Sequence, residues 1–164
     1  TGYNEEQENK IKEASNNTRI FKSANMSLGI NVLINLAKQA TNVLGETFDI
    51  EIIEKHHNKK VDAPSGTAKM IANAINKELN DSMEFNYGRN GNDAKRKENE
   101  IGIHSLRMGS EVGTHEIIFA MGSQVITLKH EAENRSLFAD GAVSAAEFLV
   151  KQEKGFYNMD NILE

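Results

Sequence analysis

The sequence of 164 residues contains no cysteine and only one proline. Without cysteine the chain can form neither a disulfide framework nor a metal site built on thiolates, and this composition fits a reducing cytoplasm. No uninterrupted apolar run approaches the roughly 20 residues of a membrane span, so we expect no membrane partner. Basic residues are also outnumbered, and the net charge of −5 argues against a nucleic-acid partner, because phosphate binding relies on accumulated lysine and arginine.

The residues that are present fit a soluble globular protein. Hydrophobic residues make up 38% of the chain and charged residues 26%, and the length suffices for one ordinary domain with a sizeable core. No secretory signal pattern is found at the start. The chain opens on Thr-Gly without an initiator methionine, so we expect a fragment or a processed product.

Hydrophobic periodicity and turn residues predict nine elements. Helices are predicted over residues 4–16, 28–44, 64–79 and 137–151, and strands over residues 18–24, 48–56, 100–107, 114–121 and 124–132. Residues 87–99 are polar and lack periodicity, which indicates a surface loop. The order predicts an α+β (α/β) fold with a mixed sheet and helices on one face, its last three strands forming a meander.

The stretch from Glu54 to Ala68, EKHHNKKVDAPSGTA, gathers two histidines, three lysines and the only proline. Neighbouring strand residues point to opposite faces, so His56 and His57 cannot both face the same way in a regular strand. Either histidine could donate a proton near neutral pH. Lys60 would add a fixed positive charge, and Asp62 could hold a lysine or a loop amide.

The second half of this stretch reads as the start of a helix, with Ser65 or Thr67 as the cap. The first amides of a helix lack intrahelical acceptors and lie at the positive end of its dipole, so they bind carboxylate or phosphate. Gly66 would let a ligand approach the backbone closely. Taken singly, these features are more typical of a helix cap, a surface histidine pair and a solvated loop than of a site. Their contiguity favours a pocket for a small dianion with a proton donor beside it.

The stretch EIIEKHHNKKVDAPSGTA resembles the signature of the dihydrodipicolinate reductase family of bacterial lysine and diaminopimelate synthesis. Further segments resemble that family in order along the chain: the initial TG, SANMSLGINVL, EIGIHSLRMGSEVGTHEIIF, which looks like a family hairpin, and RSLFADGAVSAAEFL. The dinucleotide fingerprint G-x-G-x-x-G and the phosphate loop are both absent. The family's first hundred or so residues, which grip the dinucleotide, have no counterpart before Thr1, so we expect incomplete cofactor binding.

The resemblance implies reduction of a cyclic unsaturated imine dicarboxylate with NADH or NADPH. His56 would donate the proton and Lys60 would stabilise the developing charge. Substrate carboxylates would be bound by His57, Ser65, Gly66 and Thr67. The nicotinamide and its ribose would lie along Thr1, Ser23, Ala24, Asn25 and Met26.

The resemblance also implies an organisation of the chain. Residues 1–26 would be the tail of a Rossmann-type nucleotide domain, residues 27–133 the substrate-binding and tetramerisation domain, and residues 134–164 a returning helix. A homotetramer would form through the sheet of the substrate domain, in the cytoplasm. The role of Arg135 stays open, and Arg89 and Arg107 could reach a carboxylate or be structural.

Three other functions compete with a reductase. A metal-dependent hydrolase could use His56 and His57 with partners drawn from Glu54, His104, His115 and His130, but no H-E-x-x-H spacing is found. A non-catalytic module could bind a dicarboxylate and oligomerise. RNA binding through the two basic runs conflicts with the net charge and with the lack of aromatic residues near either run.

Overall fold

The structure, a computed structural model, describes residues 3–163. Thr1, one of the residues predicted to contact the cofactor, lies outside the described residues. The chain divides into two compact units. Unit 1 contains the described residues up to Asn31 and those from Arg135 onward, and unit 2 contains Val32–Asn134. The boundaries expected from the sequence fall after residues 26 and 133.

Unit 2 is built on a sheet of five strands in the order β3-β4-β2-β5-β6. The strands are β2 (Asp49–His56), β3 (Glu84–Asn86), β4 (Glu100–Arg107), β5 (Gly113–Met121) and β6 (Gln124–Ala132). β2 pairs parallel to β4 and antiparallel to β5, and β5 and β6 form an antiparallel hairpin. The predicted mixed sheet of an α+β fold is therefore confirmed.

The predicted meander of the last three strands is wrong, as is the predicted hairpin between residues 100 and 121. β4 and β5 lie on opposite sides of β2, and the connection 108–112 crosses the end of β2. The amide of Met108 donates to the carbonyl of His56 at 2.9 Å, and that of Asn58 donates to the carbonyl of Gly109 at 3.2 Å. Such a short loop can skip one strand because two strand spacings are only about 9.6 Å, which three extended residues span.

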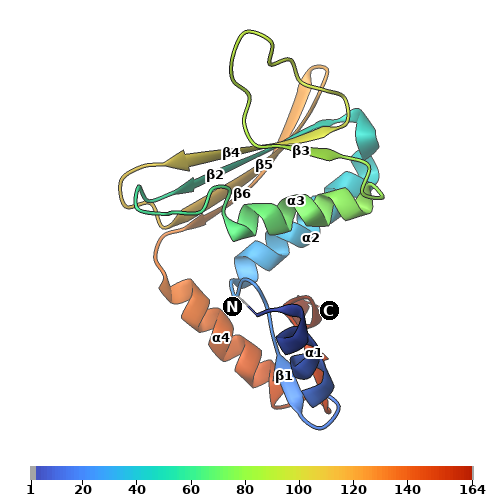
Figure 1. The fold of residues 1–164 in the computed structure, drawn as a ribbon, viewed down its shortest axis with the longest axis vertical. Helices are drawn as coiled ribbons and strands as arrows, with labels where there is room; N and C mark the ends of the chain where they lie inside the picture. Colours follow the sequence, from blue (N-terminus) through green and yellow to red (C-terminus); the bar gives the residue numbers. More distant parts are fainter. Residues whose placement is uncertain (1–2, 164) are drawn as a thin grey trace. The chain divides into compact units, whose positions relative to one another are not determined.

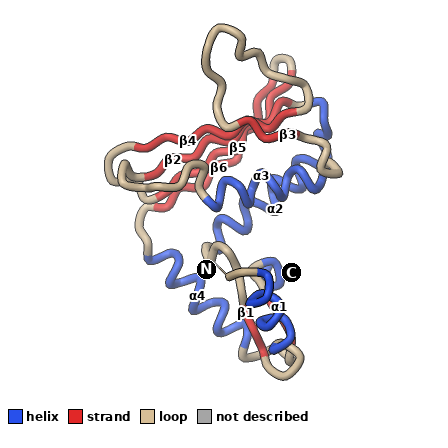
Figure 2. Tube along the Cα trace, in the orientation of Figure 1, coloured by secondary structure: helices blue, strands red, loops and turns tan. Residues whose placement is uncertain are grey.

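One face of this sheet is covered by α3 (Gly66–Glu78) and by the part of α2 (Leu28–Leu44) that belongs to unit 2 (Figures 1 and 2). Alternate strand residues point to this face and are 1% exposed or less: Ile50, Ile52, Ile101, Ile103, Ile117 and Phe119. From α3, four fully buried residues at helical spacing meet them: Ala68, Ile71, Ala72 and Ile75. The core of unit 2 therefore lies between this face and the helices.

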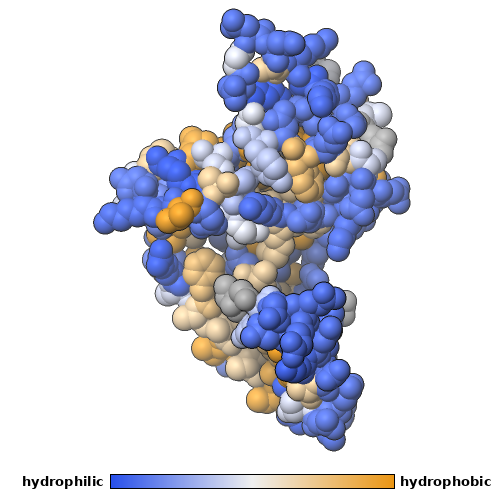
Figure 3. Space-filling view, in the orientation of Figure 1, coloured by the Kyte–Doolittle hydropathy of each residue, from blue (hydrophilic) through white to orange (hydrophobic). Residues whose placement is uncertain are grey.

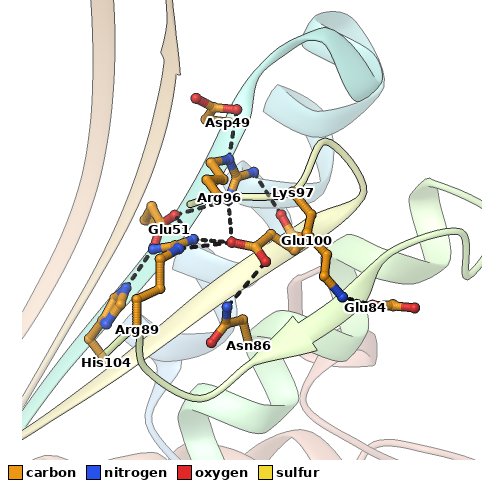
Figure 4. Close-up of polar contacts among 9 residues, drawn as sticks. All are labelled: Asp49, Glu51, Glu84, Asn86, Arg89, Arg96, Lys97, Glu100 and His104. Atoms are coloured by element: carbon orange, nitrogen blue, oxygen red, sulfur yellow. Dashed lines mark hydrogen bonds and ion pairs between the residues drawn. The ribbon is translucent and has the colours of Figure 1, made fainter. Parts of the chain in front are cut away.

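A network of arginines and carboxylates ties the polar loop 87–99 to the opposite face of the sheet (Figure 4). The guanidinium of Arg89 donates to both carboxylate oxygens of Glu51, at 2.6 and 3.1 Å, and to Glu100. Arg96 donates to Glu51 at 2.9 Å and to the backbone carbonyl of Glu100 at 2.7 Å. The predicted surface loop is confirmed and its surface is hydrophilic (Figure 3), and the contacts of Arg89 and Arg96 hold it against the sheet.

Glu51 is the centre of this network. His104 places its Nε2 2.6 Å from the carboxylate of Glu51. Burial alone would raise the pKa of Glu51, but the hydrogen bonds from Arg89 and His104 outweigh burial and lower it. A β carbon on Gly102 would lie 1.9 Å from this carboxylate, so a glycine is required beside it.

Unit 1 contains α1 (Glu5–Ala14), β1 (Arg19–Phe21), α4 (Ser136–Leu149), β7 (Gly155–Tyr157) and α5 (Asp160–Leu163). Asn4 caps α1 through a capping box with Gln7, as its position at the predicted helix start indicates. β1 lies within the predicted strand 18–24 and pairs parallel to β7. The sequence pattern did not predict β7, because a three-residue strand is too short to show periodicity. In the described part of the chain, no helix is both long and apolar enough to cross a membrane.

Candidate active site

Two polar residues continue the buried face of β2 where that strand ends. The side chains of Ile50 and Ile52 are followed in the same phase by Glu54, which is fully buried, and by His56, which is 9% exposed. Their neighbours across the sheet lie on β4 and β5, where Arg107 is opposite His56 and His115 is opposite Glu54. Burying an ionised carboxylate destabilises the fold unless cations or hydrogen-bond donors surround it, so the partners of Glu54 define the site.

The carboxylate of Glu54 is surrounded by hydrogen-bond donors. Arg107 donates to both of its oxygens, at 2.7 and 2.9 Å, and the backbone amide of Ser65 donates at 3.0 Å. Burial alone would raise the pKa of Glu54. The hydrogen bonds from Arg107, Ser105, His56 and the amide of Ser65 outweigh burial and lower the pKa to about 2, so Glu54 is ionised at neutral pH.

His56 lies against this carboxylate, with its Nδ1 2.5 Å from Oε2 of Glu54. An ionised carboxylate can only accept hydrogen bonds, so Nδ1 carries the proton of this bond. The ring of His115 lies edge-on to that of His56, with 5.3 Å between centroids. Desolvation, and then the charge of His56, lower the pKa of His115 to about 3, so His115 is neutral near pH 7.

The predicted helix start is confirmed at Ser65, whose hydroxyl accepts from the amide of Ala68 at 3.1 Å. The same hydroxyl lies 3.2 Å from Nε2 of His115, so both polar groups of Ser65 are engaged inside the fold. Gly66 follows on the exposed side, and a β carbon there would meet nothing within 4 Å. Neither packing nor backbone strain therefore requires a glycine at this position.

Lys60 belongs to the loop that joins β2 to α3. Its ammonium lies 2.8 Å from the carboxylate of Asp62 and lowers the pKa of that group, so Asp62 does hold a lysine. The backbone carbonyl of Asp62 accepts a hydrogen bond from Arg107 at 2.8 Å. The loop is thus connected through Arg107 to Glu54 and His56. His57 is half-buried just beyond the strand, and its carbonyl accepts from the amide of Lys60.

The described residues predicted to contact the cofactor belong to unit 1, whereas Glu54, His56 and Lys60 belong to unit 2. Ser23, Ala24 and Met26 line a hollow of about 630 Å³ together with aromatic and polar residues of the same unit, among them Phe21, Lys22, Phe156 and Asn158. The hydroxyl of Ser23 donates to the carbonyl of Asn25 at 2.9 Å and shapes this loop. Apolar rings beside polar atoms suit an aromatic amide, so the residues fit a nicotinamide.

The other histidines named in the metal-site alternative lie outside the contacts of Glu54. His104 lies on the opposite face with Glu51, and half-buried His130 on β6 is opposite His115. Burial lowers the pKa of His130. Within residues 3–163 no group of three or more histidine or acidic side chains is arranged to hold a metal ion. Arg89 is part of the loop network, and Arg135 is an exposed residue of unit 1 at the start of α4.

Several known proteins are similar to this chain. Residues 29–163 match the family model described as dihydrodipicolinate reductase, C-terminus. The chain belongs to this family. It is 54% identical over its whole length to the 4-hydroxy-tetrahydrodipicolinate reductase of Caldanaerobacter subterraneus subsp. tengcongensis and 51% identical to that of Clostridium novyi, and it spans 65% of the length of each.

A solved structure extends the likeness to the fold. Dipicolinate-bound dihydrodipicolinate reductase from Paenisporosarcina sp. TG-14 is 28% identical to the chain, with a TM-score of 0.75. The match covers 99% of this chain and 62% of that one. Family membership and fold, both predicted from the motifs, are therefore confirmed.

Sequence reasoning found the loop and the helix start but missed the buried partners. From the sequence, Glu54 and His115 are candidates only as metal ligands, and the role of Arg107 stays open. One signal was available, because Glu54 and His56 continue the phase of Ile50 and Ile52 into the buried face. A carboxylate in that phase requires a cation from elsewhere in the fold.

Proposed function

We propose that the chain carries the substrate site of a nicotinamide-dependent 4-hydroxy-tetrahydrodipicolinate reductase of lysine and diaminopimelate biosynthesis. The observation that carries this proposal is the junction of β2 and α3. There the buried His56 is hydrogen-bonded to the ionised Glu54, which also accepts from the amide of Ser65 at the start of α3. The loop between β2 and α3 adds Lys60. This combination suits a small dianion that must also receive a proton.

Each predicted residue has a role in this proposal. Ser23, Ala24, Asn25 and Met26, with Thr1 as a further predicted contact, would hold a reduced nicotinamide, NADH or NADPH, which would supply the hydride. His56 gives a proton to the anion that hydride transfer produces, and Lys60 stabilises the negative charge that develops on it. His57 contacts one carboxylate of the substrate, and Gly66 and Thr67 bind the other at the start of α3. The direct contact expected from Ser65 stays a prediction.

The open face of the sheet supports the proposed homotetramer. Apolar side chains reach this face at Leu106 (39% exposed) and Val125 (65% exposed), and the half-buried Ile53 and Ile118 lie on the same face. Exposed apolar side chains gathered on one face are typical of a protein interface. We place this assembly in the cytoplasm. The domain roles stay as the resemblance implies: unit 2 binds substrate, and the flanking segments 1–26 and 134–164 belong to a nucleotide domain.

Calorimetric titration with pyridine-2,6-dicarboxylate tests the proposal, with pyridine-2-carboxylate as the matched ligand that lacks one carboxylate. We expect the dicarboxylate to bind at least tenfold more tightly, because the second carboxylate meets its own group of donors. Reduced nicotinamide should tighten this binding. A folded chain that does not distinguish the two ligands would contradict the proposal. If reduced nicotinamide leaves the affinity for the dicarboxylate unchanged, the non-catalytic binding and oligomerisation module is favoured instead.

A further inference from the structure

A proton donor must present one defined ring nitrogen to the substrate, and the surroundings of His56 define which one. Its Nδ1 lies 2.5 Å from the carboxylate of Glu54, and the side chain of His56 is only 11% exposed. On the other edge of the ring, a β carbon at Gly113 would lie 3.1 Å from Nε2. The imidazole is therefore confined on both edges, and Gly113 leaves the space that Nε2 requires.

The carboxylate that faces Nδ1 is itself fixed by Arg107. The two hydrogen bonds from this guanidinium, at 2.7 and 2.9 Å, set the plane of the carboxylate and favour its ionised form. The amide of Ser65 adds a third donor at 3.0 Å. Each oxygen of Glu54 thus has two donors, so the group cannot turn away from His56 without losing bonds in a fully buried place.

The remaining charged groups around His56 are few. His115, from β5, is neutral near pH 7, and the ammonium of Lys60 is paired with Asp62. Among these described residues, the negatively charged group in direct contact with the imidazole of His56 is the carboxylate of Glu54. The state of the imidazole therefore depends on this carboxylate and on the arginine that holds it.

We propose that Glu54 and Arg107 are positioning residues for proton transfer by His56. Arg107 orients the ionised carboxylate, and the carboxylate fixes the ring of His56 with its proton on Nδ1. Nε2 is then the nitrogen that exchanges a proton with the ligand. The proposal deepens the function proposed above and rests on it for the role of His56.

Nuclear magnetic resonance of the chain with ¹⁵N-labelled histidine tests this, at a pH at which the ring of His56 is neutral. The tautomer follows from the nitrogen shifts, and His56→Gln assigns the signals. We expect the Nδ1–H tautomer in the unmodified chain. The variant Glu54→Leu/Arg107→Met, which removes both buried charges together, should show the mixed tautomers of an unpartnered histidine and bind pyridine-2,6-dicarboxylate at least tenfold more weakly.

The chain offers a matched control on the opposite face of the sheet, where Glu51 pairs with His104. Glu51→Gln should leave the His56 signals and the dicarboxylate affinity unchanged. If the double variant does not fold, Glu54→Asp, which keeps the charge but shortens the side chain, should still reduce the Nδ1–H population.

An Nε2–H tautomer in the unmodified chain, or an Nδ1–H tautomer that persists in a folded variant without the carboxylate, would overturn the positioning role. The tautomer is read without ligand, so its outcome is separate from that of the proposed function. If the tautomer depends on Glu54 as expected but no chain binds the dicarboxylate, the positioning role is supported and the proposed function fails.

Discussion

The buried carboxylate at the end of β2 should make the stability of unit 2 sensitive to acid. Glutamate has an ordinary pKa of 4.5, and that of Glu54 is about 2 in the folded unit. At 1.36 kcal/mol per pH unit, this difference corresponds to about 3 kcal/mol of free energy of unfolding. Because the pKa is lower in the folded state, this contribution is complete above about pH 5 and is lost as the pH falls toward 2.

The variant Glu54→Gln keeps the shape of the side chain and removes its titration. We expect the variant to be less stable than the unmodified chain at pH 6, since it leaves Arg107 without its ionic partner. Between pH 5 and pH 2 the difference between the two chains should shrink by about 3 kcal/mol, as Glu54 becomes protonated in the unmodified chain.

Urea titrations at several pH values measure this, with the methyl signals of Ile50 and Ile52 as reporters because both side chains lie in the core of unit 2. The change should persist in high salt, since a buried pair is screened little. Glu131→Gln is a suitable control, because its partner Lys129 is exposed and salt should screen that pair. Curves for the unmodified chain and Glu54→Gln that stay parallel from pH 5 to pH 2 would refute the reasoning.

Three glycines lead to further predictions. Gly66→Ala should leave the stability of unit 2 unchanged or raise it by up to about 1 kcal/mol, because alanine is the better helix former. Calorimetry should nevertheless show at least tenfold weaker dicarboxylate binding. Unchanged binding would argue against close ligand approach at this position. Gly102→Ala should expel the carboxylate of Glu51 from its arginines and cost about 1–3 kcal/mol in urea unfolding, and an unchanged midpoint would contradict the role given to the network. A β carbon at Gly141 would lie 1.8 Å from the carbonyl of Met26, so Gly141→Ala should shift the amide resonances of residues 23–26. Unchanged resonances there would show that α4 does not constrain this loop.

The parts of the fold that depend on local pattern were predictable from the sequence. The helix 28–44 has the predicted bounds, because its apolar stripe is long and Gly45, with a φ of +65°, ends it. The cap at Ser65 follows from the preference for serine before the first helical turn. Long periodic segments and specific capping residues carry this information in neighbouring positions.

The order of the strands was not predictable in the same way. A short loop between two strands usually makes a hairpin, and the pattern of residues 100–121 contains nothing that distinguishes a hairpin from a connection that skips one strand. The residues of β2 that face the helices are all buried, and β2 lies in the interior of the sheet with β4 on one side and β5 on the other. This central position of β2 requires β4 and β5 to lie apart. The place of Arg107 in the site follows from this topology, because pairing of β4 with β2 puts it opposite His56. The local motif alone therefore could not find it.

The central claim is that the loop and helix start after β2 bind a dicarboxylate, and two adjacent lysines test it most directly. Lys60 is 22% exposed and tied to Asp62 within the cluster, whereas Lys59 is an exposed neighbour of the same charge. The dissociation constant of pyridine-2,6-dicarboxylate should be measured for Lys60→Ala and Lys59→Ala. The account predicts at least tenfold weaker binding for Lys60→Ala, about 1.4 kcal/mol, and less than about twofold for Lys59→Ala. Equal effects of the two substitutions would show that the loop attracts the ligand only by its overall charge, and would contradict a built site.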